Sequence, residues 1–323
     1  MTLKHKTIVY EYFLFALLVC LGVALVVGGG FKDAVTEGLS IWAFSVLPSL
    51  FPYTVISISL SKLGVTTLIC NKFTPITKRI FNTSGVTAYA YFISLLAGYP
   101  MGAKTVADLK ENGYLTDAEA QRAVAFCSTS SPMFLISTVG GICFGSIKFG
   151  FLLFLTQVIS SLVLGVVFSF YKRKDKPRTR SVPYKSCDNL FYESVFSAIT
   201  SMLTVGGTIT FFSVVSKVLT HFNVLAPAVY PLGKLLGSYT LANGFVVGLL
   251  ECSNGLTVLG SCGIGFLSLP IACFICGFGG ISIIMQSLTY IKSAKIKTAP
   301  FLLAKVGQAV LSFLLGLIFN LFL

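Results

Sequence analysis

Long apolar segments dominate this chain, and several are interrupted by polar or helix-breaking residues. Five stretches reach the length of about 20 residues that a helix needs to cross a bilayer: 8–30, 40–60, 149–171, 195–215 and 301–323. Two further apolar regions, 86–112 and 117–145, are broken near their middles. The pattern predicts an all-α polytopic membrane protein with re-entrant hairpins and broken helices.

A weak internal repeat divides the chain into two copies. Residues 37–60 align with 193–216 at a constant offset of 156. Further equivalent pairs are Cys127 with Cys276 and Gly165 with Gly316, at offsets of 149 and 151. Two copies interrupted at matching places are typical of a secondary transporter whose binding site lies where the copies meet.

The first interruption is the sequence Ala-Gly-Tyr-Pro-Met-Gly-Ala-Lys at 97–104. Proline removes a backbone donor, and the flanking glycines loosen the helix. Polar residues follow at 108–112, too soon for a complete crossing. We interpret 86–112 as a re-entrant hairpin, and a proline kink in an ordinary spanning helix is the alternative.

The second interruption is the run Ser128-Thr129-Ser130-Ser131-Pro132. A capping box at Thr116–Glu119 predicts that a helix begins there, and a new helix is expected after Pro132 with Ser131 at its cap. A helix N-terminus inside the membrane, flanked by hydroxyls, suits a buried carboxylate. A serine-rich surface for helix packing is the alternative.

The second copy has equivalent interruptions at 251–255 and 276–280. Glu251 is the one charged residue between Leu235 and Tyr290. An ionisable group inside a membrane costs at least ~2.5 kcal/mol, so it is expected to be functional. Glu251 is predicted to bind a coupling proton or cation, or the substrate, unless it only hydrogen-bonds freed backbone. Lys104 is predicted to neutralise an anion, with an interfacial lysine as the alternative.

Composition and charge agree with a membrane protein. Hydrophobic residues make up 55% and charged residues 11%, against roughly 25% charged in soluble domains. The net charge of +13 arises mainly in short loops at 62–79, 172–185 and 292–297. Basic loops mark the cytoplasmic side and attract anionic lipid, so nucleic acid is not an expected partner.

This topology gives seven crossings and two re-entrant hairpins, with the second copy inverted relative to the first. The expected organisation is an N-terminal transmembrane helix at 1–34, repeat 1 at 35–171, a basic cytoplasmic loop at 172–190 and repeat 2 at 191–323. The apolar run at 8–30 exceeds the 7–15 residues of a signal-peptide core, which favours an uncleaved anchor.

Catalytic and metal-binding patterns are scarce. The nine cysteines are scattered, and the one CxxC, Cys273 to Cys276, is expected to be packing. There are two histidines and no HExxH, GxSxG, GxGD or Walker motif. We therefore expect no enzyme, no metal and no cofactor.

Three motifs carry a resemblance to a known family. They are 98–104 (GYPMGAK), 115–122 (LTDAEAQR) and 127–134 (CSTSSPMF), with a shorter match at 250–256 (LECSNGL). The chain resembles, over about 35–320, the YlbJ (SpoVV) family of sporulation integral membrane proteins. That family belongs to the nucleoside recognition, or gate domain, group, which is similar in plan to concentrative nucleoside transporters.

The resemblance implies export of dipicolinic acid across the outer forespore membrane of an endospore-forming bacterium, from the mother cell towards the forespore. The rival hypotheses are a nucleoside or nucleobase symporter and a non-transporting sporulation scaffold. A proton or sodium ion is the expected coupling ion. The predicted substrate-binding residues are Gly98, Tyr99, Pro100, Lys104, Ser128, Thr129, Ser130, Ser131, Glu251, Ser253, Asn254 and Gly279.

Overall fold

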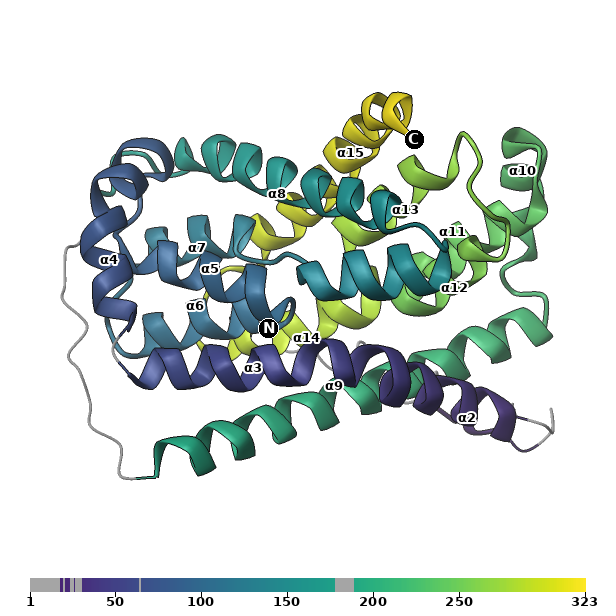
Figure 1. The fold of residues 1–323 in the computed structure, drawn as a ribbon, viewed down its shortest axis with the longest axis horizontal. Helices are drawn as coiled ribbons and strands as arrows, with labels where there is room; N and C mark the ends of the chain where they lie inside the picture. The colour runs from purple at the N-terminus through teal and green to yellow at the C-terminus, as the bar shows by residue number, and fades with distance from the viewer. Residues whose placement is uncertain (1–17, 20, 24–25, 27–30, 64, 178–188) are drawn as a thin grey trace, which may run out of the picture.

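The computed structural model describes residues 18–19, 21–23, 26, 31–63, 65–177 and 189–323 (Figure 1). Within this part of the chain every regular element is a helix. The all-α prediction is therefore confirmed. Most of the first predicted crossing, 8–30, lies outside the described residues.

The two halves of the chain repeat one order of elements: a long helix, a short helix, a helical hairpin, a broken helix and a long helix. In the first half, the first long helix consists of α2 (Lys32–Ser40), η1 (Ile41–Val46) and α3 (Leu47–Lys62), and the short helix of α4 (Val65–Ile76) and η2 (Thr77–Phe81). The hairpin consists of α5 (Val86–Ala97) and α6 (Met101–Glu111). The broken helix consists of α7 (Asp117–Phe126) and η3 (Phe134–Cys143), and the last long helix is α8 (Ile147–Ser169). In the second half they are α9 (Leu190–His221), α10 (Ala226–Leu236), α11 (Tyr239–Leu250) and α12 (Cys252–Gly260), α13 (Ser268–Phe278) and α14 (Gly280–Ser293), and α15 (Thr298–Phe319), followed by η4 (Asn320–Phe322).

The two halves are inverted relative to each other. The end of α3 meets the start of α9 through an ion pair between Lys62 and Glu193, and the two helices run in opposite directions in Figure 1. The last helices of the halves, α8 and α15, cross where the Gln308 amide donates to the Gln157 side-chain oxygen at 3.2 Å. These two glutamines differ by 151 in number, the offset that relates Gly165 to Gly316. The axis relating the halves thus passes near this pair.

Five described helices are long and apolar enough to cross a membrane, or six if the bent pair 69–81 and 86–97 counts as one. The long helix of the first half begins at Lys32. The predicted loop at 62–79 is wrong, because most of it forms α4 and η2. A helix places its exposed apolar side chains Phe73, Ile76 and Ile80 on one face, which a bilayer surface can cover.

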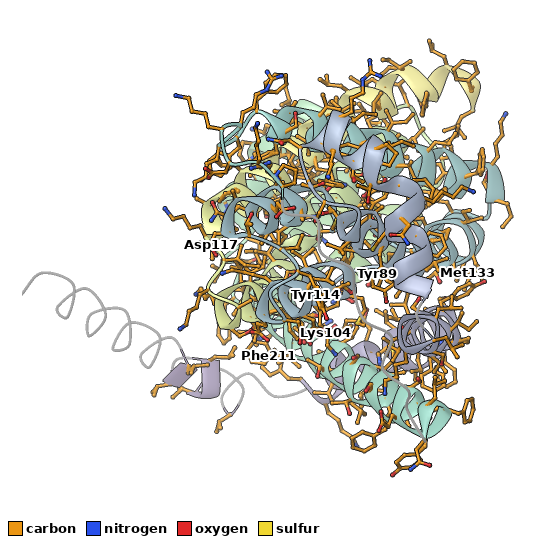
Figure 2. All side chains as sticks on the ribbon, turned by 90° about the vertical axis from the view of Figure 1, so that its left-hand side faces the viewer. Tyr89, Lys104, Tyr114, Asp117, Met133 and Phe211 are labelled. Carbon is orange, nitrogen blue, oxygen red and sulfur yellow. The ribbon has the colours of Figure 1, made fainter. Side chains whose placement is uncertain are left out.

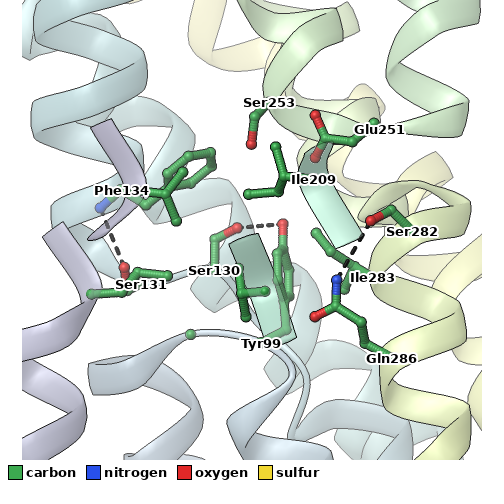
Figure 3. Close-up of a pocket in the computed structure, with 14 residues that line it drawn as sticks. Tyr99, Ser130, Ser131, Phe134, Ile209, Glu251, Ser253, Ser282, Ile283 and Gln286 are labelled. Carbon is green, nitrogen blue, oxygen red and sulfur yellow. Dashed lines mark hydrogen bonds between the residues drawn. The ribbon is translucent and has the colours of Figure 1, made fainter. Parts of the chain in front are cut away.

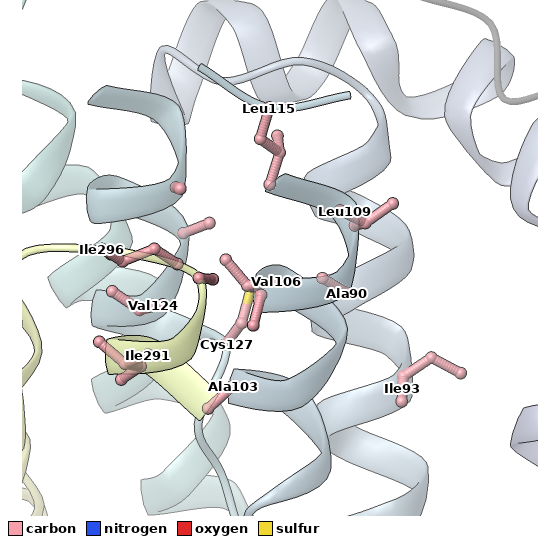
Figure 4. Packing of buried hydrophobic residues seen from close by; sticks show 14 of the residues in the cluster. Ala90, Ile93, Ala103, Val106, Leu109, Leu115, Val124, Cys127, Ile291 and Ile296 are labelled. Atoms are coloured by element: carbon pink, nitrogen blue, oxygen red, sulfur yellow. The ribbon is translucent and has the colours of Figure 1, made fainter. Parts of the chain in front are cut away.

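One face of the first hairpin, α5 with α6, is buried against the rest of the molecule. Ala90, Ala103 and Val106 are fully covered and form one apolar cluster with Val124 of α7 and Ile291 of α14 (Figure 4). This packing supports the re-entrant interpretation, since a hairpin with an unwound tip needs protein around its backbone.

Buried polar side chains secure the loops at the end of the molecule that carries α4. The capping box predicted at Thr116 and Glu119 is present, and the Glu119 carboxylate also accepts the Ser84 N–H at 2.9 Å. The buried Arg122 guanidinium donates to the carbonyl oxygens of Asn82, Lys172 and Asp175. Arg122 therefore ties the end of η2 to the turn that follows α8.

Replacing Gly255 by alanine is expected to destabilise the second hairpin. A Cβ at this position would lie 2.2 Å from the Cα of Gly248, because the backbones of α11 and α12 are closely packed there. Overpacking of this kind costs about 1–3 kcal/mol. Thermal unfolding in detergent measures it, with Gly207→Ala as the matched control because nothing lies within 4 Å of that position. Equal melting temperatures for both variants would contradict the packing.

Candidate functional site

The tip of the first hairpin lies against the break in the first broken helix. Gly98 has φ +71°, and a Cβ there would lie 3.0 Å from the Ser131 N–H nitrogen. Both the backbone conformation and the close approach therefore require glycine. The Tyr99–Pro100 peptide bond that follows is cis.

The run Ser128–Ser131 is non-helical, as predicted, and its hydroxyls have different roles. Ser131 caps the helical turn that leads into η3 by accepting the Phe134 N–H at 3.2 Å. The Thr129 N–H donates to the Ser94 hydroxyl of α5 at 2.9 Å, and the two hydroxyls are also 2.9 Å apart. Thr129 is thus committed to the first hairpin, whereas the buried Ser128 hydroxyl has no hydrogen-bond partner in the described structure.

Tyr99 joins the hairpin tip to both broken helices. Its hydroxyl accepts a hydrogen bond from Ser130 in the first break. It donates to the carbonyl oxygen of Cys276, near the second break, at 3.2 Å. One side chain therefore connects segments of both halves at the centre of the molecule.

In the second half, Glu251 separates α11 from α12. Its carboxylate caps α12 by accepting the Asn254 N–H at 2.7 Å. The Asn254 amide donates to the Ser213 hydroxyl of α9 at 2.7 Å. The second break has two left-handed glycines, Gly279 with φ +85° and Gly280 with φ +78°. Glu251 therefore satisfies freed backbone, which was one of the two roles expected from the sequence.

A small pocket lies where these breaks converge (Figure 3). Gly98, Tyr99, Ser130, Ser131, Glu251 and Ser253 line it, together with Ser282, Ile283 and Gln286 of α14, and Phe134, Val46, Leu50, Val205 and Ile209 provide its apolar wall. Its volume is about 40 Å³, whereas ligand pockets measure about 300–1,000 Å³. The pocket in the described conformation is therefore smaller than a typical ligand site.

Six of the twelve predicted residues line this pocket directly. Pro100, Ser128, Thr129 and Gly279 lie in the same breaks without lining the pocket, and Asn254 lies in the first turn of α12. Lys104 is elsewhere: it lines a separate cavity of about 330 Å³ with Lys62, Asp108, Tyr89 and Tyr114, among others (Figure 2). Its ammonium lies 5.9 Å from the centre of the Tyr290 ring. The structure does not bring Lys104 to the central pocket.

A different lysine, missed in the sequence, lies beside the pocket. Lys305 of α15 is 1% exposed. Its ammonium donates to the Ser128 carbonyl oxygen at 3.1 Å and to the Gln308 side-chain oxygen at 3.2 Å. It also lies 5.2 Å from the centre of the Tyr99 ring. The sequence feature that could have identified Lys305 is that it is the one charged residue in the apolar run 301–323.

These groups suit a small anion. Lys305 supplies a positive charge that takes part in neither of the two ion pairs found within the described residues. The helix N-terminus that follows the first break brings partial positive charge to the same region, whereas the N-terminus of α12 is capped by Glu251. In the described part of the chain, no group of three or more His, Cys, Asp or Glu residues is placed to hold a metal ion.

Comparison with known proteins identifies one curated relative and one solved structure. No family model matches the chain. The sporulation integral membrane protein YlbJ of Bacillus subtilis (strain 168) is 26% identical over 309 residues, covering 86% of this chain and 74% of YlbJ. This similarity supports assignment of the chain to the YlbJ family.

The solved structure is a double variant of CNTnw, a concentrative nucleoside transporter, in an outward-facing state. The two share a TM-score of 0.57 and 12% sequence identity, over 100% of this chain and 87% of CNTnw. The likeness confirms the predicted fold class.

Substitutions of Glu251 separate capping from charge. Glu251→Ala removes the acceptor of the Asn254 N–H and is expected to cost about 0.5–2 kcal/mol of stability. Glu251→Gln keeps a side-chain oxygen and should retain most of it. Thermal unfolding of the two purified variants measures the difference. Equal losses of stability would show that the carboxylate acts through its charge rather than as a cap.

Proposed function

We propose, from the assignment of the chain to the YlbJ family, that this protein is a secondary transporter for a small anionic metabolite. The metabolite we propose is dipicolinic acid, exported across the outer forespore membrane from the mother cell towards the forespore. The protein acts without a catalytic step or a cofactor. Relation to a sporulation membrane protein and the fold of a nucleoside transporter support the class of function.

The observation that carries the choice of an anion is the position of Lys305. Its buried ammonium contacts the carbonyl of Ser128, two residues before Ser130, which lines the pocket. Its hydrogen bonds go to neutral oxygens, which offset a buried charge less well than a carboxylate does. A carboxylate bound in the enlarged pocket would supply the missing counter-charge.

The pocket lining also fits a flat aromatic dicarboxylate. Tyr99, Phe134, Ile209 and Ile283 provide apolar surface for a ring, while Ser130 provides a hydroxyl. The helix N-terminus that follows Pro132 brings partial positive charge towards one carboxylate, and Lys305, bonded to the Ser128 carbonyl of the same break, brings positive charge towards the other. These features suit other small dicarboxylates as well, and the experiment below compares them.

Transport requires the small pocket to widen and to open alternately to the two sides. The inverted halves supply two hairpins of opposite orientation, each with its tip at the pocket. In transporters built from inverted repeats, movement of one part against the other around a fixed site gives alternating access. Tyr99, which bonds to both broken helices, must exchange at least one partner during this movement.

A nucleoside symporter is the second candidate, because the solved structure with a similar fold is a nucleoside transporter. A ribose would use neutral hydroxyl contacts and would gain little from Lys305. Competition by nucleosides for the bound substrate therefore distinguishes the two. A non-transporting scaffold would move neither solute.

The test is uptake of radiolabelled dipicolinate by proteoliposomes. Lys305→Gln is expected to weaken uptake and binding roughly 10- to 100-fold, as expected for loss of a charged hydrogen bond of about 1.5–3 kcal/mol. Lys148→Gln is the matched control, since Lys148 is exposed at the start of α8. The melting temperature of each variant confirms folding.

Excess uridine should leave dipicolinate uptake unchanged, whereas phthalate, another aromatic dicarboxylate, should reduce it. Saturable uridine uptake that survives Lys305→Gln would favour the symporter. Absence of any solute flux from protein with unchanged melting behaviour would leave the scaffold as the function.

A further inference from the structure

A long apolar groove lies on the outer surface between α4 with η2, α5 and α8. Its volume is about 650 Å³, and its lining is almost entirely hydrocarbon and aromatic. Phe73, Ile76, Phe92 and Val163 line it and are each 39–47% exposed. The groove is thus open at the surface rather than part of the core.

The groove runs from one end of the molecule towards its middle. Along α5 it extends from Ala88 to Leu95, a distance of about 10 Å at the rise of an α-helix. Its outer end is formed by 69–81, which is bent by 94° from α5. If α5 enters the membrane, this bend lays α4 and η2 along the membrane surface, as Figure 1 shows for α4 against the long helices.

Basic side chains lie at that outer end. We define the basic cluster as Lys72, Lys78, Arg79, Arg173 and Lys174, all of which are exposed. The Asn82 amide donates to the Arg173 carbonyl at 3.3 Å, which holds the turn after α8 against η2. Asp175 is the only acidic residue in 62–81 and 171–177. A cationic surface therefore adjoins an apolar groove.

The buried Arg122 fixes the position of the basic cluster relative to the groove. Its guanidinium donates to backbone carbonyls on both sides of the junction, Asn82 after η2 and Lys172 after α8. The relative positions of the groove wall and the basic cluster are thus built into the fold. Flexible surface lysines alone would not hold a headgroup and a chain in fixed register.

We propose that this surface binds one anionic phospholipid. The phosphate-containing headgroup contacts the basic cluster, and an acyl chain occupies the groove between α5 and α8. Charge complementarity selects this occupant, since the basic loops lie on the cytoplasmic side, where the leaflet carries anionic lipid. A zwitterionic lipid fills the groove equally well but gains less from the cations. The inference is independent of the transported substrate.

Native mass spectrometry of detergent-purified protein tests the headgroup. With equimolar phosphatidylglycerol and phosphatidylcholine, the wild-type protein is expected to retain one phosphatidylglycerol molecule preferentially. The double variant Arg79→Gln/Arg173→Gln should lower this retention roughly 30-fold, from the loss of two charge contacts. The matched control is Lys148→Gln/Lys234→Gln, which removes two cations remote from the groove.

A substitution that fills the groove tests whether an acyl chain occupies it. Val163→Trp adds bulk to its wall and should abolish retention while leaving the basic cluster intact. Val167→Trp, one turn further along α8 on an exposed position outside the groove, is the control. Circular dichroism and the melting temperature confirm that all variants fold.

Two results would overturn the proposal. Equal retention of the two lipids, unchanged by the arginine variants, would show that the groove takes acyl chains without headgroup recognition. A dimer or trimer mass that Val163→Trp dissociates would show that a second copy of the chain covers the groove. Neither result depends on dipicolinate transport, so failure here and failure of the proposed function are distinguishable.

Discussion

The structure depends on how interrupted helices satisfy their backbone at membrane depth. No water is available in the hydrocarbon region, so each freed N–H or carbonyl needs a partner from the protein. The interruptions provide partners to one another. The Tyr99 hydroxyl of the first hairpin accepts a hydrogen bond from Ser130 and donates one to the Cys276 carbonyl. Lys305 donates a hydrogen bond to the Ser128 carbonyl. The breaks therefore converge on one place because each completes the hydrogen bonding of another.

This requirement explains why the centre of the molecule is polar although its surface is apolar. Ser94, Thr129 and Ser131 are buried and bonded within the breaks. Glu251 caps α12 from a position that also borders the pocket. Side chains that stabilise the breaks thus also present donors and acceptors to a ligand. A transport site of this kind needs few residues that serve binding alone.

Equivalent positions of the two inverted halves carry the same residue near the axis that relates them, but different residues at the site. Gln157 and Gln308 are equivalent and bond to each other. Lys305 has no such partner, since the residue 151 positions earlier is Phe154. In the same way, the four consecutive hydroxyl residues of the first break correspond to Gly277, Phe278, Gly279 and Gly280 in the second. The duplicated plan builds the frame, and the unequal positions supply the charge and the selectivity for an anion.

The apolar periodicity and its interruptions were sufficient to predict the all-α class, the hairpins, the breaks and the inverted order. Local chemistry decides these features: a proline, paired glycines or a run of hydroxyls stops a helix wherever it occurs. The sequence also predicted the caps at Thr116 and Ser131, because capping depends on residues three positions apart.

Tertiary structure alone decided which of two lysines faces the site. Lys104 adjoins a conspicuous motif yet lines another cavity, whereas Lys305 reaches the breaks from a helix almost 200 residues further along the chain. The surface helices at 65–81, where a loop was expected at 62–79, likewise involve contacts with distant segments, since α5 and α8 pack against them. Such contacts join segments far apart in sequence, and no local pattern records them.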